Sequence, residues 1–435
     1  MIPGFTIGIA LGHTVSAIAT DGAGAVVARA DSEAAGSKAI SETLNRIGVD
    51  RVDRVMVAGL HDVDPLQLPA EKVGILRIAS PSSTSIAPLS GWPRHLARRV
   101  AGYVATVAGG HHFDGSPRCP LDTDSIARFA KECRRNKIRA VAVVGTNSQS
   151  AAGHEQRAAQ IVTEIVGQRT NLVLGSTMSG IGLVERENTA VIEAALAQTT
   201  MRSVDEISAE LNQGGVDTEL HWVTGTGTLL STAELVSHPL KLHRSLLASA
   251  LNGVMHETDR ANLIAIDARG DPVWVYTVSD GIPNQTPSGT RFFGIPTVVP
   301  DLRRVALNGQ SEGQVMRCLE RHRLWMGDVP AVRMSGGESG RTELASVTDS
   351  ELSGWAAAVG AASAEAGGFV DRVFNFSDST YDEAVRTAKT EAVDAAIRAG
   401  ADPAKVEIAR LTDTPLTYVT SSMVRLSAMA RGPLL

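Results

Sequence analysis

Two stretches of the chain that lie far apart share one pattern, and this pattern constrains the fold more than any other feature. Residues 5–24 are FTIGIALGHTVSAIATDGAG and residues 262–283 are NLIAIDARGDPVWVYTVSDGIP. Each has an apolar strand, a polar turn with one glycine, a second apolar strand and an Asp-Gly pair that suits a tight hairpin turn. Two such hairpins predict two lobes of related topology that face a cleft. The alternative is that hairpins recur by chance in an α/β protein.

Apolar runs rich in β-branched residues alternate with alanine-rich helical patterns, which predicts an α/β fold. The expected strands cover residues 5–10, 15–20, 25–30, 54–59, 72–78 and 138–145. The expected helices cover residues 38–48, 124–136, 153–166, 187–211 and 382–399. A chain of 435 residues is too long for one compact domain, so we expect two or three lobes.

Composition argues against several classes of protein. The net charge of −6 leaves no basic surplus to neutralise phosphates, so nucleic acid is not expected as a partner. Cys119, Cys133 and Cys318 form no CxxC pair, which favours a reduced, cytoplasmic location over a disulfide scaffold or a structural zinc site. The N-terminal sequence lacks a signal-peptide pattern, and no apolar stretch is long enough to span a membrane, so no membrane association is expected.

Several motifs along the chain resemble those of the hydantoinase/oxoprolinase family, in particular hydantoinase A-like chains. GLVERENTAVIEAAL, residues 182–196, is the most specific, because it is similar to the family's Leu-Glu-Arg-Glu-Asn helix start. The other matching segments are GGHHFDG at 109–115, the strand and helix at 138–166, GTGTLLS at 225–231 and the helix and strand at 368–408. The resemblance extends over nearly the whole chain.

The resemblance implies the two-lobed fold shared by actin, sugar kinases and heat-shock ATPases, with a duplicated hairpin-bearing lobe. The N-terminal lobe is expected over residues 1–180 and a shortened, hydantoinase A-like C-terminal lobe over residues 181–435. Many family members use ATP to activate a lactam, imide or carbonyl oxygen. Glycine turns suit such chemistry because backbone N–H groups approach phosphate closely where no side chain obstructs them.

The first turn of this chain departs from the family's Asp-x-Gly-Gly-Thr-x-Thr-Asp pattern. Both acidic positions are alanine, at Ala10 and Ala17, and His13 replaces the second glycine. In the second turn Asp267 and Gly270 remain, while Pro272 removes a backbone donor.

Three further turns are altered as well. The family's Ser-Gly-Pro is SALN at 249–252, the turn at 225–226 has lost its amide and carboxylate, and SGGESG at 335–340 contains a glutamate that repels phosphate. These losses predict a degenerate site that does not bind ATP in the usual family mode.

The retained polar groups are histidines and a carboxylate in glycine-flanked loops. His61 lies in GLHDVDP, and His111, His112 and Asp114 lie in GGHHFDG. Imidazole and carboxylate groups serve as general acids and bases near neutral pH, so these four are the predicted catalytic residues. A divalent metal held by His61, His111 and Asp114 is a second possibility. The alternative is that these are ordinary core or surface residues, since spacing alone does not show that they converge.

A second group is expected to line the substrate cleft, namely His13, Asp267, Arg269 and Asp271. Arg269 can pair with an anionic substrate, or it can be a solvated turn residue. His13 replaces a glycine and can contact a ligand or simply fill the vacated space.

The predicted function is that of a hydantoinase-like enzyme acting without ATP on a small carbonyl or cyclic substrate, by acid–base ring closure (a cyclase) or ring opening. A role in specialised metabolism suits this chemistry. One alternative is an ATP-dependent cyclic amide or imide hydrolase. Another is a catalytically silent scaffold subunit, because the family often forms hetero-oligomers; a homo-oligomer or a complex with a second hydantoinase-type subunit is possible.

Overall fold

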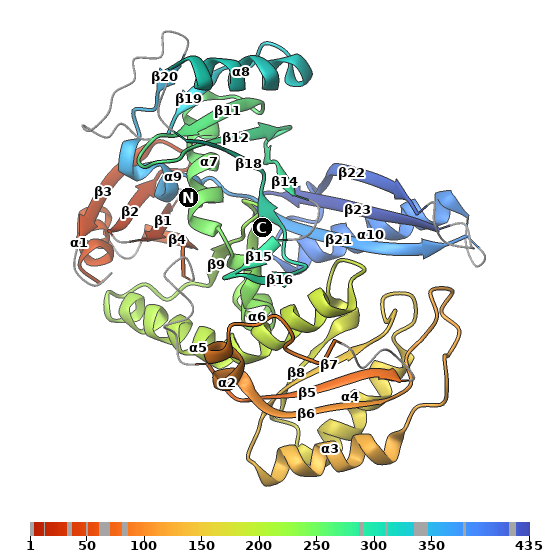
Figure 1. Cartoon of the computed structure of the whole chain (residues 1–435). Coiled ribbons are helices and arrows are strands. Elements are labelled where there is room, and N and C mark those ends of the chain that lie inside the picture. The colour runs from red at the N-terminus through yellow and green to blue at the C-terminus, as the bar shows by residue number, and fades with distance from the viewer. Residues whose placement is uncertain are drawn as a thin grey trace.

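The structure is a computed structural model (Figure 1), and it describes residues 4–12, 14–32, 37–48, 51–60, 70–80, 86–286, 290–308, 312–334, 347–376, 380–416 and 423–435. It is a mixed α/β fold with one nine-stranded, one six-stranded and one four-stranded sheet, plus two small strand pairs. None of the helices in these ranges has the length and apolar character needed to cross a membrane.

The nine-stranded sheet joins both ends of the chain, in the order β22-β23-β21-β10-β9-β4-β1-β2-β3. Its strands are β1 (Phe5–Leu11), β2 (Val15–Thr20), β3 (Val26–Ser32), β4 (Val52–Ala58), β9 (Leu220–Val223), β10 (Leu229–Ser231), β21 (Ala366–Asn375), β22 (Glu407–Pro415) and β23 (Met423–Gly432). Strands from either side of residue 180 therefore share one sheet, and the division into lobes at that residue stays a prediction.

The six-stranded sheet repeats part of the first. It contains β11 (Leu263–Asp267), β12 (Val273–Ser279), β13 (Ile282–Pro283), β18 (Arg304–Leu307), β19 (Ala331–Arg333) and β20 (Thr348–Asp349). In both sheets the hairpin's first strand pairs antiparallel with its second and parallel with a later strand, β4 or β19. Helices α1 (Ser37–Ile47) and α8 (Glu312–Met326) precede those later strands. The predicted duplication of hairpin-bearing lobes is confirmed.

The third sheet is parallel throughout, in the order β6-β5-β7-β8. It is formed by β5 (Val73–Ser80), β6 (Ala101–Ala108), β7 (Ala140–Gly145) and β8 (Asn171–Leu174), connected through α2 (Arg94–Val100), α3 (Thr123–Arg135) and α4 (Gly153–Val166). Every residue of β7 is buried, as expected for a central parallel strand covered on both faces.

Helix α5 (Leu183–Gln213) has 31 residues and runs between the four-stranded sheet and the rest of the molecule (Figure 1). Alanine, leucine, glutamate and glutamine supply its high helix propensity. The sequence predicts its start at residue 187, and the structure begins it at Leu183. Residues 186–197 are buried, so this half of the helix packs on several sides at once.

The remaining helices and short strands fill the spaces between the sheets. They are α6 (Thr232–Ser237), α7 (Ser245–Thr258), α9 (Ala356–Ala362), α10 (Tyr381–Arg398), the 3₁₀ turns η2 (Gly175–Thr177), η3 (Pro239–Leu242) and η4 (Ser353–Trp355), and the pairs β14 (Gln285–Thr286) with β17 (Asp301–Leu302) and β15 (Thr290–Phe292) with β16 (Ile295–Thr297).

Helices α7 and α9 join the two duplicated sheets. Helix α7 packs on the six-stranded sheet, and α9 packs on β1 and β2 of the nine-stranded sheet. The two helices approach very closely, since a Cβ at Gly360 would lie 1.7 Å from the carbonyl oxygen of Ser249. Ser249 Oγ also donates a hydrogen bond to the carbonyl oxygen of Ala357 at 2.7 Å.

We expect Gly360→Ala to destabilise the protein by about 1–3 kcal/mol, because the added methyl group overpacks the α7–α9 contact. Gly153→Ala is the matched control: no atom lies within 4 Å of its Cβ position, and alanine lowers the entropy of the unfolded chain. Urea unfolding of both variants checks this. Equal stability of the two variants would contradict the packing argument.

Candidate functional site

The predicted histidine loop, residues 109–115, follows β6. His111 is 5% exposed, and its ring centroid lies 4.3 Å from that of His154 in α4. Burial, and then the neighbouring His154, lowers the pKa of His111, and burial also lowers that of His154. His154 Nδ1 accepts a hydrogen bond from Gly110 N at 3.0 Å. The two imidazoles therefore pack as neutral rings that hold β6 to α4.

The other members of the predicted catalytic set face outward or are not described. His112 and Asp114 are exposed. Ser116 donates to Asp114 Oδ1 through its backbone N at 2.9 Å and its hydroxyl at 2.6 Å, and these hydrogen bonds lower the pKa of Asp114. His61 lies outside the described residues. In the described part of the chain, no three His, Cys, Asp or Glu side chains form a metal-binding group, so the metal stays a prediction.

The second hairpin turn, between β11 and β12, contains an internal ion pair. Arg269 Nε and Nη2 donate to the two carboxylate oxygens of Asp267 at 2.9 and 2.8 Å. Burial raises the pKa of Asp267, but the hydrogen bonds and charge of Arg269 outweigh it and hold that pKa below its ordinary value. Asp271 is exposed. The acidic residue retained from the family pattern is thus already paired with a cation.

The first hairpin turn is covered by an apolar side chain. Leu246 Cδ2 lies 3.3 Å from the Cβ position of Gly12, and Leu246 packs on a small cluster that includes Ala10 and Ile18. His13 lies outside the described residues, as does the turn at 335–340. The described part of this turn therefore presents Gly12 to a hydrocarbon group.

The described members of the two predicted groups of site residues are not brought together. Residues 109–115 follow a strand of the four-stranded sheet, while Asp267 and Arg269 belong to the six-stranded sheet. Figure 1 places these sheets at opposite ends of the molecule. Their roles in catalysis and substrate binding stay predictions.

A cavity of about 170 Å³ lies between α5, the β9–β10 turn and β21. We call it the threonine cavity. Its polar side chains include Glu193, Thr224, Thr226, Thr228, Glu234, His238, Lys241 and His243. It lies at GTGTLLS, one of the motifs that resemble the family, and beside the segment 238–243.

Three threonines of the β9–β10 turn form a cluster of hydroxyl groups at the threonine cavity. Thr224 Oγ1 accepts from the backbone N of Thr226 at 3.2 Å and of Thr228 at 3.3 Å. The three hydroxyls also contact one another, at 2.7 Å between Thr224 and Thr226, 3.2 Å between Thr224 and Thr228, and 3.0 Å between Thr226 and Thr228. A hydroxyl both donates and accepts, so a threonine of this cluster can turn its proton toward a carbonyl oxygen in the cavity.

Two glycines shape this turn. A Cβ at Gly225 would lie 2.0 Å from the carbonyl oxygen of His243, so only glycine lets the two backbones approach. Gly227 has a φ of +84°, in the left-handed region that favours glycine, and its carbonyl accepts from Asn252 Nδ2 at 2.6 Å. The threonines are therefore held on a rigid turn.

An imidazole–carboxylate pair also lines the threonine cavity. His238 Nδ1 lies 3.1 Å from Glu193 Oε2, and the Glu193 side chain is 4% exposed. A buried carboxylate of this kind fixes the tautomer and orientation of an imidazole, so that the other ring nitrogen can accept or give a proton.

His243 lies on another wall of the threonine cavity. Burial and the charge of Arg244 lower its pKa to about 4, although Asp301, with Oδ1 3.9 Å from His243 Nε2, acts in the opposite direction. His243 is therefore neutral at pH 7, and its buried Nε2 makes no hydrogen bond within the described residues.

Sequence reasoning missed the Glu193–His238 pair. The two histidines of HPLKLH are five residues apart and do not share a helical face, but a 3₁₀ turn, η3, separates them here and both reach the threonine cavity. Glu193 is one of several glutamates on α5, and neither its burial, which it shares with Glu187, nor its contact with His238 has a signal in the sequence.

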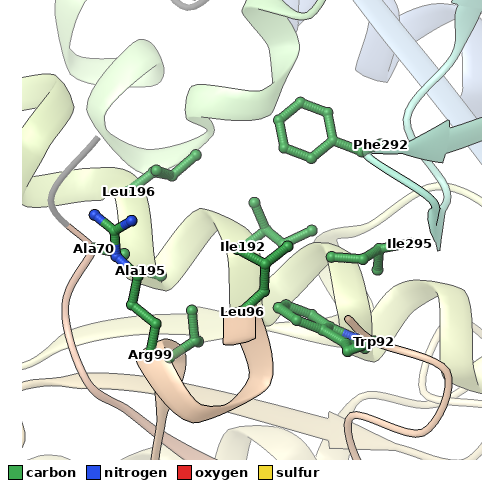
Figure 2. Close-up of a pocket in the computed structure, with 10 residues that line it drawn as sticks. Ala70, Trp92, Leu96, Arg99, Ile192, Ala195, Leu196, Phe292 and Ile295 are labelled. Carbon is green, nitrogen blue, oxygen red and sulfur yellow. The ribbon is translucent and has the colours of Figure 1, made fainter. Parts of the chain in front are cut away.

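Figure 2 shows a smaller, apolar cavity of about 40 Å³ between α2, α5 and the β15–β16 hairpin. Trp92 and Ile192 lie on one side, with Phe292 and Ile295 across from them. Trp92 Nε1 donates to Asn188 Oδ1 at 2.7 Å, and Asn188 Nδ2 donates to the carbonyl of Pro296 at 2.9 Å. This region secures α5 and offers no acid–base group.

The lowered pKa of His243 predicts acid sensitivity. Unfolding restores the ordinary pKa of 6.5, so the unfolded state takes up the proton first as pH falls. Stability is therefore complete above pH 6.5 and declines toward pH 4, by about 2 kcal/mol at pH 5 from this group. We expect His243→Gln to lose less stability than the wild type between pH 7 and 5 in urea unfolding. His95→Gln, at an exposed position of α2, is the control. Parallel wild-type and His243→Gln curves would contradict the assignment.

Comparison with known proteins agrees with the motifs. Residues 29–166 match the family model described as the hydantoinase/oxoprolinase N-terminal region. No protein with a curated description matches the sequence significantly. Two solved structures share the fold: a nucleotide-free acetone carboxylase, studied for ATP-dependent acetone carboxylation, at 11% identity and TM-score 0.65, and an ATP-dependent caprolactamase from Pseudomonas jessenii, at 14% identity and TM-score 0.74.

Each alignment covers 99% of this chain and 88% of the other. At identities this low, the two solved structures establish a shared fold and nothing about activity. The match to the family model is separate support, because it comes from the sequence of residues 29–166. The predicted two-lobed α/β fold and the resemblance are confirmed. Residues 29–166 of this chain are similar to the N-terminal region of the hydantoinase/oxoprolinase family, and the whole chain has the fold of these two enzymes.

Proposed function

We propose that the chain is a hydantoinase-like enzyme that opens or closes the ring of a small cyclic amide or imide in the threonine cavity, without ATP. The observation that carries this proposal is the Glu193–His238 pair beside the three threonines of a rigid turn. Together they provide a proton-transfer group and a hydrogen-bond donor, which are the groups that carbonyl addition requires.

In the ring-closing direction, a substrate N–H attacks a carbonyl carbon of the same molecule. His238 accepts the proton released from nitrogen, and the threonine hydroxyl donates a hydrogen bond to the carbonyl oxygen. His238 then returns the proton to that oxygen or to a departing hydroxide, which leaves as water. Ring opening uses the same groups in reverse, since both directions pass through one tetrahedral intermediate.

Three features support action without ATP. Asp267 is held in a bidentate pair by Arg269, Gly12 is covered by Leu246, and the turn at 225–226 has neither amide nor carboxylate. The neighbouring enzymes are described as ATP-dependent, so an ATP-dependent cyclic amide hydrolase is the alternative. Assembly with itself or with a second hydantoinase-type subunit stays a prediction.

The acid–base assignment predicts that His238→Asn lowers kcat by about 10²-fold or more. Glu193→Gln is expected to lower kcat less and to leave KM unchanged, because it changes the orientation of the imidazole and not the substrate contacts. Turnover of a panel of lactams and hydantoins, followed in both directions by mass spectrometry, checks this. Glu206→Gln, at an exposed position of the same helix, is the control. Full activity of His238→Asn would refute the assignment.

The proposal also predicts no thermal stabilisation by Mg-ATP. A nucleotide present well above its dissociation constant stabilises a protein by about 3–4 kcal/mol, which shifts the melting temperature by several degrees. Thermal melts with and without Mg-ATP are expected to coincide for the wild type. A shift of several degrees would instead establish the ATP-dependent alternative.

A further inference from the structure

A second, larger cavity of about 420 Å³ adjoins the threonine cavity. We call it the serine cavity. It lies between the start of α4, the turn around η2, and the strand β21 with α10. Its uncharged hydrogen-bonding side chains are Ser148, Gln149, Ser150, Gln156, Ser176, Thr177 and Ser179. Such a lining favours a polar ligand over an apolar one.

Charges at the serine cavity are paired within the protein. Arg425 Nε donates to Asp371 Oδ1 at 2.7 Å, and the two side chains share a second hydrogen bond. Arg372 forms an ion pair with Glu391 of α10. Arg425 lies outside the lining but neutralises Asp371, and Arg372 neutralises Glu391, which favours an uncharged ligand.

Ser148 provides a directed donor in this lining. It is 2% exposed, and its Oγ accepts a hydrogen bond from Arg186 Nη1 at 2.7 Å. A guanidinium group only donates, so the hydroxyl proton of Ser148 must point elsewhere. No side chain or carbonyl in the described ranges accepts it. A buried hydroxyl without an acceptor is costly, and a ligand oxygen in the cavity would satisfy it.

The two cavities share a wall. Thr177, Met178, Ser179 and Phe369 line both of them. The two cavities are therefore adjacent, and we infer that one compound reaches both, with its ring in the threonine cavity and a substituent in the serine cavity.

We propose that the serine cavity is the subsite for an uncharged polar substituent of the substrate, one with a carbonyl or hydroxyl oxygen that accepts a hydrogen bond from Ser148. This rests on the proposed function for the ring, but the subsite can be tested alone. The substrate class is thus a cyclic amide or imide carrying an amide or hydroxyl side chain, rather than a bare ring.

The first experiment uses N-acetylserinamide, which has no ring, and measures its binding by calorimetry or by saturation-transfer NMR. Gln156→Phe fills the cavity from α4, and Gln160→Phe one turn later, at an exposed position outside the lining, is the matched control. We expect binding to the wild type and to Gln160→Phe, and at least tenfold weaker binding to Gln156→Phe. Ser148→Ala, where it folds, is expected to weaken binding similarly. No binding to the wild type, or equal binding to Gln156→Phe, would overturn the proposal.

The second experiment compares hydantoin with 5-(carbamoylmethyl)hydantoin. We expect the side chain to tighten binding about tenfold, the size of one or two hydrogen bonds, in the wild type but not in Gln156→Phe. Equal affinity of the two compounds for the wild type would overturn the link between the cavities. If N-acetylserinamide binds as expected and neither hydantoin binds, the threonine cavity is not a ring site and the proposed function fails. The assignment of the serine cavity as a binding site for an uncharged polar group would still stand.

Discussion

The buried ion pair between Arg77 of β5 and Glu187 of α5 fixes the position of the helix on which the candidate site depends. Two hydrogen bonds of 2.7 Å join them, and both side chains are almost fully buried. Separating two such charges leaves each uncompensated, which costs about 3–5 kcal/mol. Arg186 adds contacts to Ser148 and the carbonyl of Gly145. Glu193 lies less than two turns further along the same helix. The contacts that hold α5 therefore also fix the position of Glu193 in the wall of the threonine cavity.

Local patterns and motifs were sufficient to predict the fold. The hairpins at 5–20 and 263–279 appear as expected, because alternating burial and Asp-Gly turns are local properties. The GLVERENT motif predicts a helix start, which the structure places at Leu183, and its Arg186 and Glu187 make buried structural contacts. The pairing order of the nine-stranded sheet could not be predicted. Strand β4 pairs with β9, which follows it in the chain only after the whole four-stranded sheet and α5, and no local signal specifies that contact.

The candidate site was harder to predict for a physical reason. Catalytic geometry depends on residues distant in sequence, and Glu193 and His238 are 45 positions apart. The glycine-flanked histidines predict a catalytic loop at residues 109–115. Glycine, however, permits close backbone packing as readily as it permits ligand binding. His111 uses that freedom to pack against His154. A histidine between glycines therefore does not by itself distinguish a structural ring from a catalytic one.

The retained Asp267 shows why a conserved-looking acid is weak support for a metal or nucleotide site. Arg269, two residues on, donates to both of its oxygens and neutralises its charge. The carboxylate of Asp267 is thus already paired with a cation of the chain. Neither Gly12 nor Gly270 has a positive φ, and no atom of the described residues lies within 4 Å of the Cβ position of Gly270. The turn at 224–228 differs, because Gly225 and Gly227 are both required by its geometry, and it presents hydroxyl groups, which suit a neutral carbonyl better than a phosphate.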